Sequence, residues 1–370
     1  MLRSTYAVIH LDAIVHNISF IKKRLPEKTG LLAVIKANAY GHGLCEVGSH
    51  LDRNPAVAMF GVAICEEGVR LREAGVKKPI LILGVTDPKH FDAVVKYDLI
   101  PAVFTKEHVF LASKAALSQN KNVSVHVKID SGMHRIGVPS LDALSELLDA
   151  FDKSPNVIMH GVFTHFAKSE SDPGFTALQA ERFEKAVSII HQRGYNPIVH
   201  AANSAAILSG SRYYYDMVRL GISMYGYYPD GKRAKDDSLL PAMSFITHVS
   251  NLQMLPAGEG VSYGQRYLTT HPTVVATLPV GYGDGYKRCL SGKADVLIGG
   301  IRCPQIGTIC MDQIMVDVSS VPSVHLGDEA VLIGPQGSEN ITADELAERA
   351  NTISYEILLS VSDRVPRIYN

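Results

Sequence analysis

LLAVIKANAYGHG, residues 31–43, is the stretch that decides the fold. Its first five residues form a continuous apolar run, which is typical of a parallel strand covered on both faces. Lys36 closes the run, and Gly41 and Gly43 loosen the backbone before the next periodic segment. A lysine at the carboxyl end of a buried strand is either a side chain that reaches solvent or an amine held in a pocket. The rest of the chain decides between these two interpretations.

Seven further strands are expected after this one. They lie at 59–63, 79–84, 100–104, 123–130, 157–163, 197–202 and 216–221. Segments with helical spacing lie between them, for example 65–75 and 176–194, and each of these two ends at a glycine. Eight strand–helix units in about 200 residues predict a (β/α)8 barrel. An open doubly wound sheet is the competing fold, but no GxGxxG follows the first strand.

The pattern changes after residues 227–241, a polar stretch with two prolines that is typical of a linker. Beyond it, short alternating strands and one late helix at 342–351 predict a mainly β domain. We therefore expect a barrel domain at 1–237 and a β domain at 238–370. An extra strand at about 1–11 precedes the barrel series and is expected to pair with the C-terminal domain. The helix after it is expected to be capped at Asp12.

Composition narrows the class of protein. The 370 residues are 46% apolar and 20% charged, as in globular proteins, and the formal net charge of −1 gives no broad basic face for nucleic acid. No apolar run approaches the roughly 20 residues that span a bilayer. The N-terminus also lacks the uninterrupted apolar core of a signal peptide. We expect a cytoplasmic protein without nucleic-acid or membrane partners.

The five cysteines suggest neither disulfides nor a metal site. Their number is odd and none belongs to a CxxC pair. Cys310 is interpreted as a small buried residue in a strand rather than as a reactive thiol.

Polar residues stand where the expected barrel strands end, which is where barrel enzymes gather their functional groups. Besides Lys36, they are Lys128, Asp130, Arg135, His165, Asn203, Ser204, Arg219, Gly221 and Ile222. A lysine amine can bind an aldehyde covalently. Ser204 and backbone N–H groups near Gly221 can hold a phosphate, as the last barrel loops often do. One rim therefore carries the parts of a pyridoxal phosphate site.

The segment AVIKANAYGHG closely resembles the cofactor-lysine signature of alanine racemases. The resemblance continues along the chain in KIDSGMHRIG (128–137), HAANSAA (200–206), MVRLGISMYG (217–226), VSYG (261–264), GYGDGY (281–286), ICMDQ (309–313) and SYEILLSVSDRVPRIY (354–369). The family has a barrel followed by a β domain, assembled as a head-to-tail dimer. The resemblance thus implies a homodimer with shared active sites that interconverts L-alanine and D-alanine and supplies D-alanine for peptidoglycan.

The resemblance also implies a role for each matching residue. Lys36 would carry pyridoxal 5′-phosphate on its amine, and Arg219 would face the pyridine nitrogen. The residues that bind the cofactor would be Lys36, Tyr40, His165, Asn203, Ser204, Arg219, Gly221, Ile222 and Tyr355. The partner subunit's Met311 would offer its backbone to the substrate carboxylate, and Tyr282 would line the entry passage.

Racemisation needs two bases, because one base cannot easily reach both faces of a flat intermediate. Lys36 becomes a free amine when substrate displaces it, so it can serve one face. Tyr263, which the family brings from the partner subunit, is the candidate for the other face. Arg135 would contact Tyr263, and its charge favours the phenolate.

Three further positions affect how this chemistry is controlled. A permanently cationic Arg219 would leave the pyridine nitrogen unprotonated, which favours racemisation over transamination. Lys128 matches a lysine that is often carbamylated in the family and then holds the arginine matched by Arg135. Thr308 departs from the family, because many relatives have an arginine there along the substrate channel.

Other functions remain open from the sequence. A serine or broad-specificity amino-acid racemase is the first alternative, although Tyr355 favours alanine because serine-preferring relatives carry a smaller polar residue there. A fold-related pyridoxal phosphate decarboxylase would have an acidic residue at the ring nitrogen and a cysteine opposite the lysine, where this chain has Arg219 and Tyr263. A non-catalytic pyridoxal phosphate carrier would lack residues 238–370.

Overall fold

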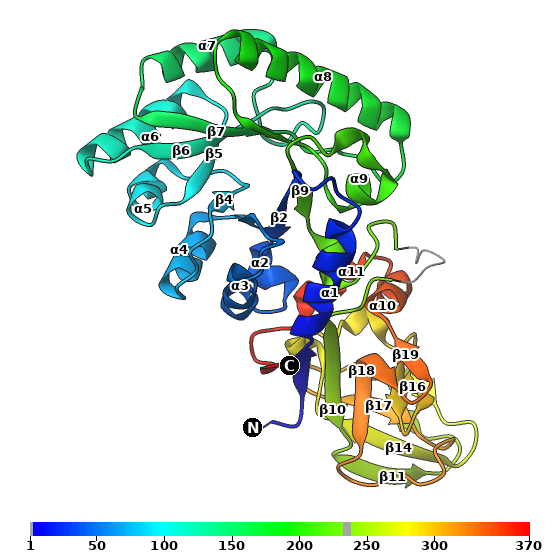
Figure 1. The fold of residues 1–370 in the computed structure, drawn as a ribbon. Coiled ribbons are helices and arrows are strands. Elements are labelled where there is room, and N and C mark those ends of the chain that lie inside the picture. The colour runs from blue at the N-terminus through cyan, green and yellow to red at the C-terminus, as the bar shows by residue number, and fades with distance from the viewer. Residues whose placement is uncertain (1–2, 232–237) are drawn as a thin grey trace.

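The computed structural model describes residues 3–231 and 238–370. Figure 1 shows a barrel surrounded by helices and, to one side of it, an elongated β domain. The barrel strands are β2 (Gly30–Val34), β3 (Met59–Val62), β4 (Ile80–Ile82), β5 (Ile100–Val103), β6 (Val123–Lys128), β7 (Val157–Phe163), β8 (Ile198–His200) and β9 (Met217–Leu220). They are parallel, follow one another in chain order, and close through the pairing of β2 with β9. The predicted (β/α)8 barrel is confirmed.

Helices alternate with these strands. They are α1 (Leu11–Lys22), α2 (Lys36–Tyr40), α3 (Leu44–Asp52), α4 (Cys65–Glu73), α5 (Phe91–Lys96), α6 (Lys106–Ser118), α7 (Leu141–Asp152), α8 (Pro173–Gln192) and α9 (Ser204–Ser209). The predicted cap of α1 is wrong, because Asp12 lies inside the first turn and His10 occupies the N-cap position without a side-chain bond. None of the described helices is long and apolar enough to cross a membrane.

The strand that the sequence analysis singled out is buried throughout its second half, with Leu31, Leu32 and Ala33 fully inaccessible. Its neighbour β3 carries Gly61, where an added Cβ would lie 2.6 Å from a methyl carbon of Leu32. A larger residue would therefore push the two strands' side chains apart inside the barrel. This packing keeps the end of β2, and with it Lys36, in a fixed place.

The second region is built on one mixed sheet. Its strands run in the order β11, β14, β17, β16, β15, β18, β10, β1 and β20, with β19 paired to β18. Their bounds are β1 (Tyr6–Ile9), β10 (Met243–His248), β11 (Asn251–Leu255), β14 (Thr273–Leu278), β15 (Asp295–Ile298), β16 (Ile301–Ile306), β17 (Ile314–Asp317), β18 (Glu329–Gln336), β19 (Glu339–Ile341) and β20 (Arg367–Tyr369). A separate hairpin consists of β12 (Gly260–Val261) and β13 (Tyr267–Leu268).

The first strand of the chain lies in this sheet and not in the barrel. β1 pairs antiparallel with β10 and parallel with β20, so both ends of the chain lie side by side (Figure 1). Part of the predicted linker at 227–241, namely residues 232–237, lies outside the described residues.

Two predictions about the β domain are wrong. Two late helices are present instead of one, namely α10 (Ala343–Ala350) and α11 (Ser354–Ser360). The second is too short for a helical period to show in the sequence. Cys310 is not in a strand and is only partly buried, because it lies in the loop that follows β16.

Candidate active site

A cavity of about 830 Å³ opens at the carboxyl ends of the barrel strands. Eleven of the predicted site residues line it, drawn from both the barrel and α11: Lys36, Tyr40, Lys128, Arg135, His165, Asn203, Ser204, Arg219, Gly221, Ile222 and Tyr355. The described residues contain no group of three or more His, Cys, Asp and Glu side chains placed to hold a metal ion. The polar groups that line the cavity are amines, guanidinium groups, hydroxyl groups, an amide, an imidazole and the Glu170 carboxylate.

Lys36 is followed by a turn of the left-handed kind. Ala37, Asn38, Ala39 and Tyr40 have φ values of 52°, 53°, 53° and 54°. L-residues avoid this conformation at a cost of roughly 1–2 kcal/mol each, so the surroundings have to hold it. The reversed turn brings Lys36 and Tyr40 into the same cavity.

Glu67 is one of the groups that hold this turn, and the sequence analysis missed it. Its buried carboxylate accepts the N–H of Ala37 at 2.5 Å and the N–H of Ala63 at 2.8 Å. Asn38 contributes from within the turn, because its side-chain oxygen accepts the N–H of Leu44 at 2.9 Å. Glu67 lies in the first turn of α4, the helix that follows β3, and this place near a strand end was the one available signal for it.

One end of the cavity offers neutral hydrogen-bond donors. Ser204 Oγ lies 3.0 Å from the N–H of Gly221, and an added Cβ at Gly221 would stand 3.1 Å from the Tyr40 hydroxyl and 3.6 Å from Ser204 Oγ. The ring of Tyr40 lies 5.9 Å from that of Tyr355. Burial raises the pKa of both tyrosines, so their hydroxyl groups keep their protons and can donate. Such a group of hydroxyl and backbone donors suits a phosphate.

Arg219 is buried in the same cavity, and several acceptors surround its two terminal nitrogens. It donates to the carbonyl oxygens of Thr164 (2.7 Å), Ala201 (2.8 Å) and His200 (3.2 Å). It also lies 3.1 Å from His200 Nδ1 and 3.2 Å from His165 Nδ1. Burial lowers the pKa of Arg219 to about 9, so the guanidinium still carries its proton at neutral pH. Among the described residues, no carboxylate forms an ion pair with it.

A chain of three histidines extends away from Arg219. His200 Nε2 lies 2.9 Å from His126 Nδ1, and His126 Nε2 lies 2.9 Å from His160 Nδ1. A guanidinium only donates, so His200 Nδ1 must accept, and each neutral ring must then donate to the next one. Burial lowers the pKa of all three histidines, and the charge of Arg219 lowers those of His126 and His200 further. The sequence analysis missed this chain, whose only signal was a histidine at the end of a barrel strand.

Two lysine amines share the cavity with Arg219. Burial, followed by the charges of nearby arginines, lowers the pKa of both Lys36 and Lys128. Lys128 Nζ lies 4.9 Å from the centre of the Phe163 ring, and the guanidinium carbon of Arg219 lies 5.4 Å from the same centre. A lowered pKa increases the fraction of neutral amine, which is the form that attacks a carbonyl carbon.

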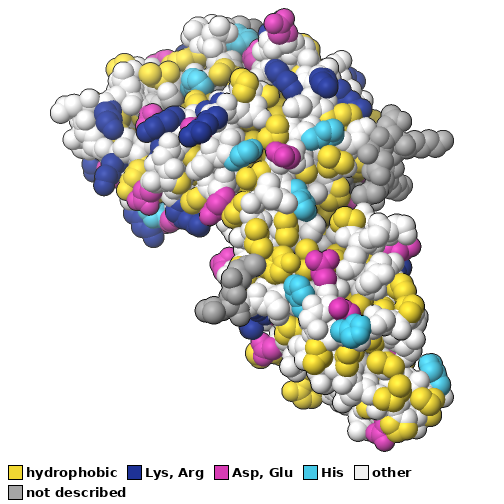
Figure 2. Space-filling model, turned by 60° about the horizontal axis from the view of Figure 1, so that its bottom comes forward, with side chains coloured by type: hydrophobic (Ala, Val, Ile, Leu, Met, Phe, Trp, Pro, Cys, Tyr) yellow, Lys and Arg dark blue, Asp and Glu magenta, His cyan; other side chains and the backbone are white. Residues whose placement is uncertain are grey.

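The remaining predicted residues lie elsewhere. Tyr263, Tyr282 and Met311 do not line the cavity, and their exposed fractions in the single chain are 72%, 41% and 53%. Two hydrogen bonds bring them close together on the β domain. Gly283, which follows Tyr282, donates its N–H to the Met311 carbonyl at 2.8 Å. Thr308, in the same loop as Met311, donates its Oγ1 hydrogen to the Tyr263 carbonyl at 2.9 Å. Thr308 is thus buried behind Tyr263. Figure 2 shows hydrophobic side chains gathered on the face where the barrel meets the β domain.

Comparisons with known proteins give one family over the whole chain. Residues 9–229 match the family model described as alanine racemase, N-terminal domain, and residues 242–369 match alanine racemase, C-terminal domain. The chain is 43% identical over 373 residues to the alanine racemase of Carboxydothermus hydrogenoformans, with 100% of each chain covered. It is 40% identical over 369 residues to that of Halothermothrix orenii, with 99% of this chain and 97% of the relative covered.

Solved structures give the same result. Alanine racemase from Clostridium difficile 630 superposes with a TM-score of 0.94 at 36% identity, and alanine racemase from Bacillus anthracis with bound L-Ala-P superposes with a TM-score of 0.93 at 35% identity. Each comparison covers 100% of this chain and 96% of the other.

His42 provides a test of the turn beside Lys36. It is fully buried, its Nδ1 lies 3.0 Å from the carbonyl oxygens of both Ala39 and Tyr40, and its ring stacks on Tyr225 at 4.4 Å. Burial lowers the pKa of His42 to about 4, against the opposing effect of the two carbonyl bonds. The folded protein therefore keeps this ring neutral at a pH where the unfolded chain protonates it.

As pH falls from about 6.5 to 4, the unfolded state alone gains this proton, so the free energy of unfolding should decrease by up to about 1.4 kcal/mol per pH unit from this group. Urea unfolding at pH 6.5, 5.5 and 4.5, at one protein concentration, measures the slope. His42→Asn keeps an N–H donor but cannot titrate, so its slope should be shallower by that amount. The exposed control His50→Asn should keep the wild-type slope, and equal slopes for His42→Asn and wild type would contradict the assignment.

Proposed function

The chain belongs to the alanine racemase family of isomerases, and we propose that it interconverts L-alanine and D-alanine by using pyridoxal 5′-phosphate and two bases from different subunits. It is thus an enzyme that acts on alanine. One observation carries the proposal. A single cavity contains both a lysine amine of lowered pKa and a group of neutral hydrogen-bond donors that suit a phosphate. We further propose that the enzyme works in the cytoplasm and supplies D-alanine for peptidoglycan.

The residues in the cavity fit the cofactor. Lys36 would hold it covalently, and its phosphate would be held by Tyr40, Ser204, Tyr355 and the backbone N–H groups of Gly221 and Ile222, with Asn203 and His165 also in the same cavity. When bound, pyridoxal phosphate supplies an aldehyde that captures the amino group and a ring that spreads the negative charge left by the α-hydrogen. The space next to Gly221 supports this assignment, since a Cβ there would lie close to the hydroxyl groups of Tyr40 and Ser204.

Arg219 determines which reaction is favoured. It retains its proton at neutral pH and has only donors, so a ring nitrogen placed against it would accept a hydrogen bond and stay unprotonated. A carboxylate at this position would instead keep the ring nitrogen protonated, as expected for a decarboxylase of this fold. The surrounding carbonyl oxygens and imidazoles are arranged for a cation, which argues against that alternative.

Arg219→Glu should increase transamination relative to racemisation, because a carboxylate favours a protonated ring nitrogen. Pyruvate release and loss of optical rotation, followed in the same reaction, give the ratio of the two products. The exposed Arg70→Glu serves as a control for the change of charge and should keep the wild-type ratio. An unchanged ratio in Arg219→Glu would contradict the assigned role.

Lys36 and Tyr263 would serve opposite faces of the substrate. In a single chain Tyr263 does not line the cavity that contains Lys36, so a head-to-tail homodimer is the arrangement we propose to unite them. Arg135, at the exposed rim of the cavity, would then meet the partner subunit's Tyr263 and favour its phenolate. Met311 would meet the substrate carboxylate through its backbone, and Tyr282 would line the passage by which alanine enters.

Tyr263→Phe should abolish racemisation in both directions but leave one base in place. In deuterated water, the variant should therefore exchange the α-hydrogen of one enantiomer of alanine and not that of the other, as NMR can follow. Tyr267→Phe, in the neighbouring hairpin, should retain racemisation and exchange both enantiomers. Exchange of both enantiomers by Tyr263→Phe would show that Tyr263 is not the second base.

The proposed cofactor bond has a direct chemical test. Borohydride reduction should remove the yellow colour of the purified enzyme and fix the cofactor on the peptide that contains Lys36. Lys36→Ala should be colourless and inactive in a D-alanine and L-alanine exchange assay. Label on another lysine would refute the assignment.

Lys128 is proposed to be carbamylated. Burial, followed by the charges of Arg219 and Arg135, lowers the pKa of the Lys128 amine, and its neutral form can add to carbon dioxide with loss of one proton. The product is a carbamate anion that can pair with Arg135. Enzyme equilibrated with 13C-labelled carbon dioxide should show one carbamate signal by NMR, and Lys128→Arg should lack it. A native enzyme without this signal would refute the proposal.

A further inference from the structure

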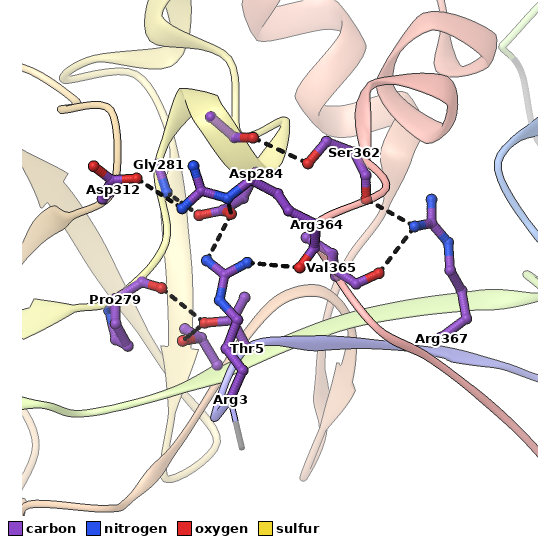
Figure 3. A network of polar contacts seen from close by, with 12 residues as sticks. Arg3, Thr5, Pro279, Gly281, Asp284, Asp312, Ser362, Arg364, Val365 and Arg367 are labelled. Carbon is purple, nitrogen blue, oxygen red and sulfur yellow. Dashed lines mark hydrogen bonds and ion pairs between the residues drawn. The ribbon is translucent and has the colours of Figure 1, made fainter. Parts of the chain in front are cut away.

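Asp284 is a fully buried carboxylate whose two arginine partners are far from it in sequence. It lies at the end of a short 3-10 turn, Tyr282–Asp284, within GYGDGY. One of its oxygens lies 2.6 Å from Arg3 and 3.0 Å from Arg364, and the other accepts the N–H of Gly281 at 3.0 Å (Figure 3). A buried carboxylate with two guanidinium partners is a rigid anchor, because any displacement leaves a charge without compensation.

Arg364 extends this anchor to a second loop. Its guanidinium also pairs with Asp312 at 2.7 Å, the residue that follows Met311 (Figure 3). We call Asp284, Arg3, Arg364 and Asp312 the Asp284 cluster. The cluster thus connects the Tyr282 turn, the Met311 loop and both ends of the chain.

The two loops are in direct contact as well. Gly283 N–H donates to the Met311 carbonyl at 2.8 Å, and Tyr282 N–H donates to the Cys310 carbonyl at 3.1 Å. A Cβ at Gly281 would lie 2.3 Å from the Cys310 carbonyl and 2.4 Å from that of Met311. The close approach therefore requires glycine at 281 and fixes the two loops relative to each other.

The segment that carries Arg364 holds the Tyr282 turn from its other side. Ser362 N–H donates to the Asp284 carbonyl and Ser362 Oγ donates to the Gly283 carbonyl, both at 3.0 Å. Arg367 belongs to the same segment, but it donates to the carbonyl of Gly41, beside the Lys36 turn, at 3.2 Å. The cluster is therefore placed to influence either the exposed loops or the cavity of its own chain.

We propose that Asp284 is a positioning residue that holds the Tyr282 turn and the Met311 loop in the shape that the partner subunit's cavity requires. This inference rests on the proposed shared site. Tyr282 and Met311 are exposed on their own chain, whereas the cluster beneath them is buried or paired. Backbone groups that contact a substrate carboxylate must be placed within a fraction of an ångström, and exposed loops reach that precision only with rigid support.

The first variant is Asp284→Asn, which keeps the size of the side chain but removes the charge that holds Arg3 and Arg364. Its dimer, confirmed by sedimentation, should show KM for alanine raised roughly tenfold with a smaller change in kcat. The cofactor absorbance should stay unchanged, because the Lys36 cavity is intact. Asp295→Asn, which loses an ion pair with Arg349 elsewhere in the same domain, is the matched control and should keep both constants.

Mixed dimers separate an effect on the partner from an effect within one chain. When Asp284→Asn is paired with Lys36→Ala, the only site with a lysine combines the barrel of the first chain with the intact β domain of the second. That site should show wild-type KM. A KM equal to that of the Asp284→Asn homodimer would overturn the proposal, because the residue would then act within its own chain.

Two further measurements keep the result unambiguous. Tyr263→Phe mixed with Lys36→Ala should recover activity if sites are shared, and failure here would count against the proposed function itself. If the Tyr263→Phe and Lys36→Ala pair recovers activity but the Asp284→Asn and Lys36→Ala pair keeps the raised KM, only the inference about Asp284 is overturned. If Asp284→Asn does not fold, Arg364→Lys, which cannot span Asp284 and Asp312 together, replaces it with the same expected outcomes.

Discussion

A reaction that removes a hydrogen from one face of a carbon and returns it to the other needs proton-transferring groups on both faces. This chain carries its half-buried Lys36 amine just after β2 and its exposed Tyr263 phenol on the β domain, outside the cavity that contains the amine. The rest of the structure follows from that separation. In the proposed dimer, the barrel would supply a cavity that is complete except for one face, and the partner's β domain would supply the missing groups.

The cavity itself depends on burying the Arg219 guanidinium, which forms no ion pair with a carboxylate among the described residues. Arg219 and Lys128 are both almost inaccessible, and their partners are carbonyl oxygens, imidazoles and the Phe163 ring. Burial, followed by the charges of Arg135 and Arg219, lowers the pKa of the Lys36 amine. The same charges favour anionic ligands such as a phosphate or a carboxylate. The strained turn after Lys36 belongs to the same design, because strain of this kind persists only where its surroundings enforce it.

The sequence allowed the architecture to be predicted because β2 and its successors are continuous apolar runs separated by helical periods. It also placed polar residues at the strand ends, so the barrel half of the site could be found. The left-handed turn could not be predicted, since none of its residues is glycine and Glu67 holds it from helix α4. The histidine chain and the Asp284 cluster were also missed, because they join residues far apart in sequence. α11 was missed because seven residues show no clear period.

If no single chain contains a complete site, activity must depend on the dimer, and a dilution series measures this dependence. Racemisation rate per chain should be measured across a dilution series with saturating pyridoxal phosphate, alongside the fraction of dimer from sedimentation at the same concentrations. The account predicts that the rate falls in proportion to the dimer fraction and approaches zero for the monomer. A monomer that racemises alanine at the full rate per chain would contradict it.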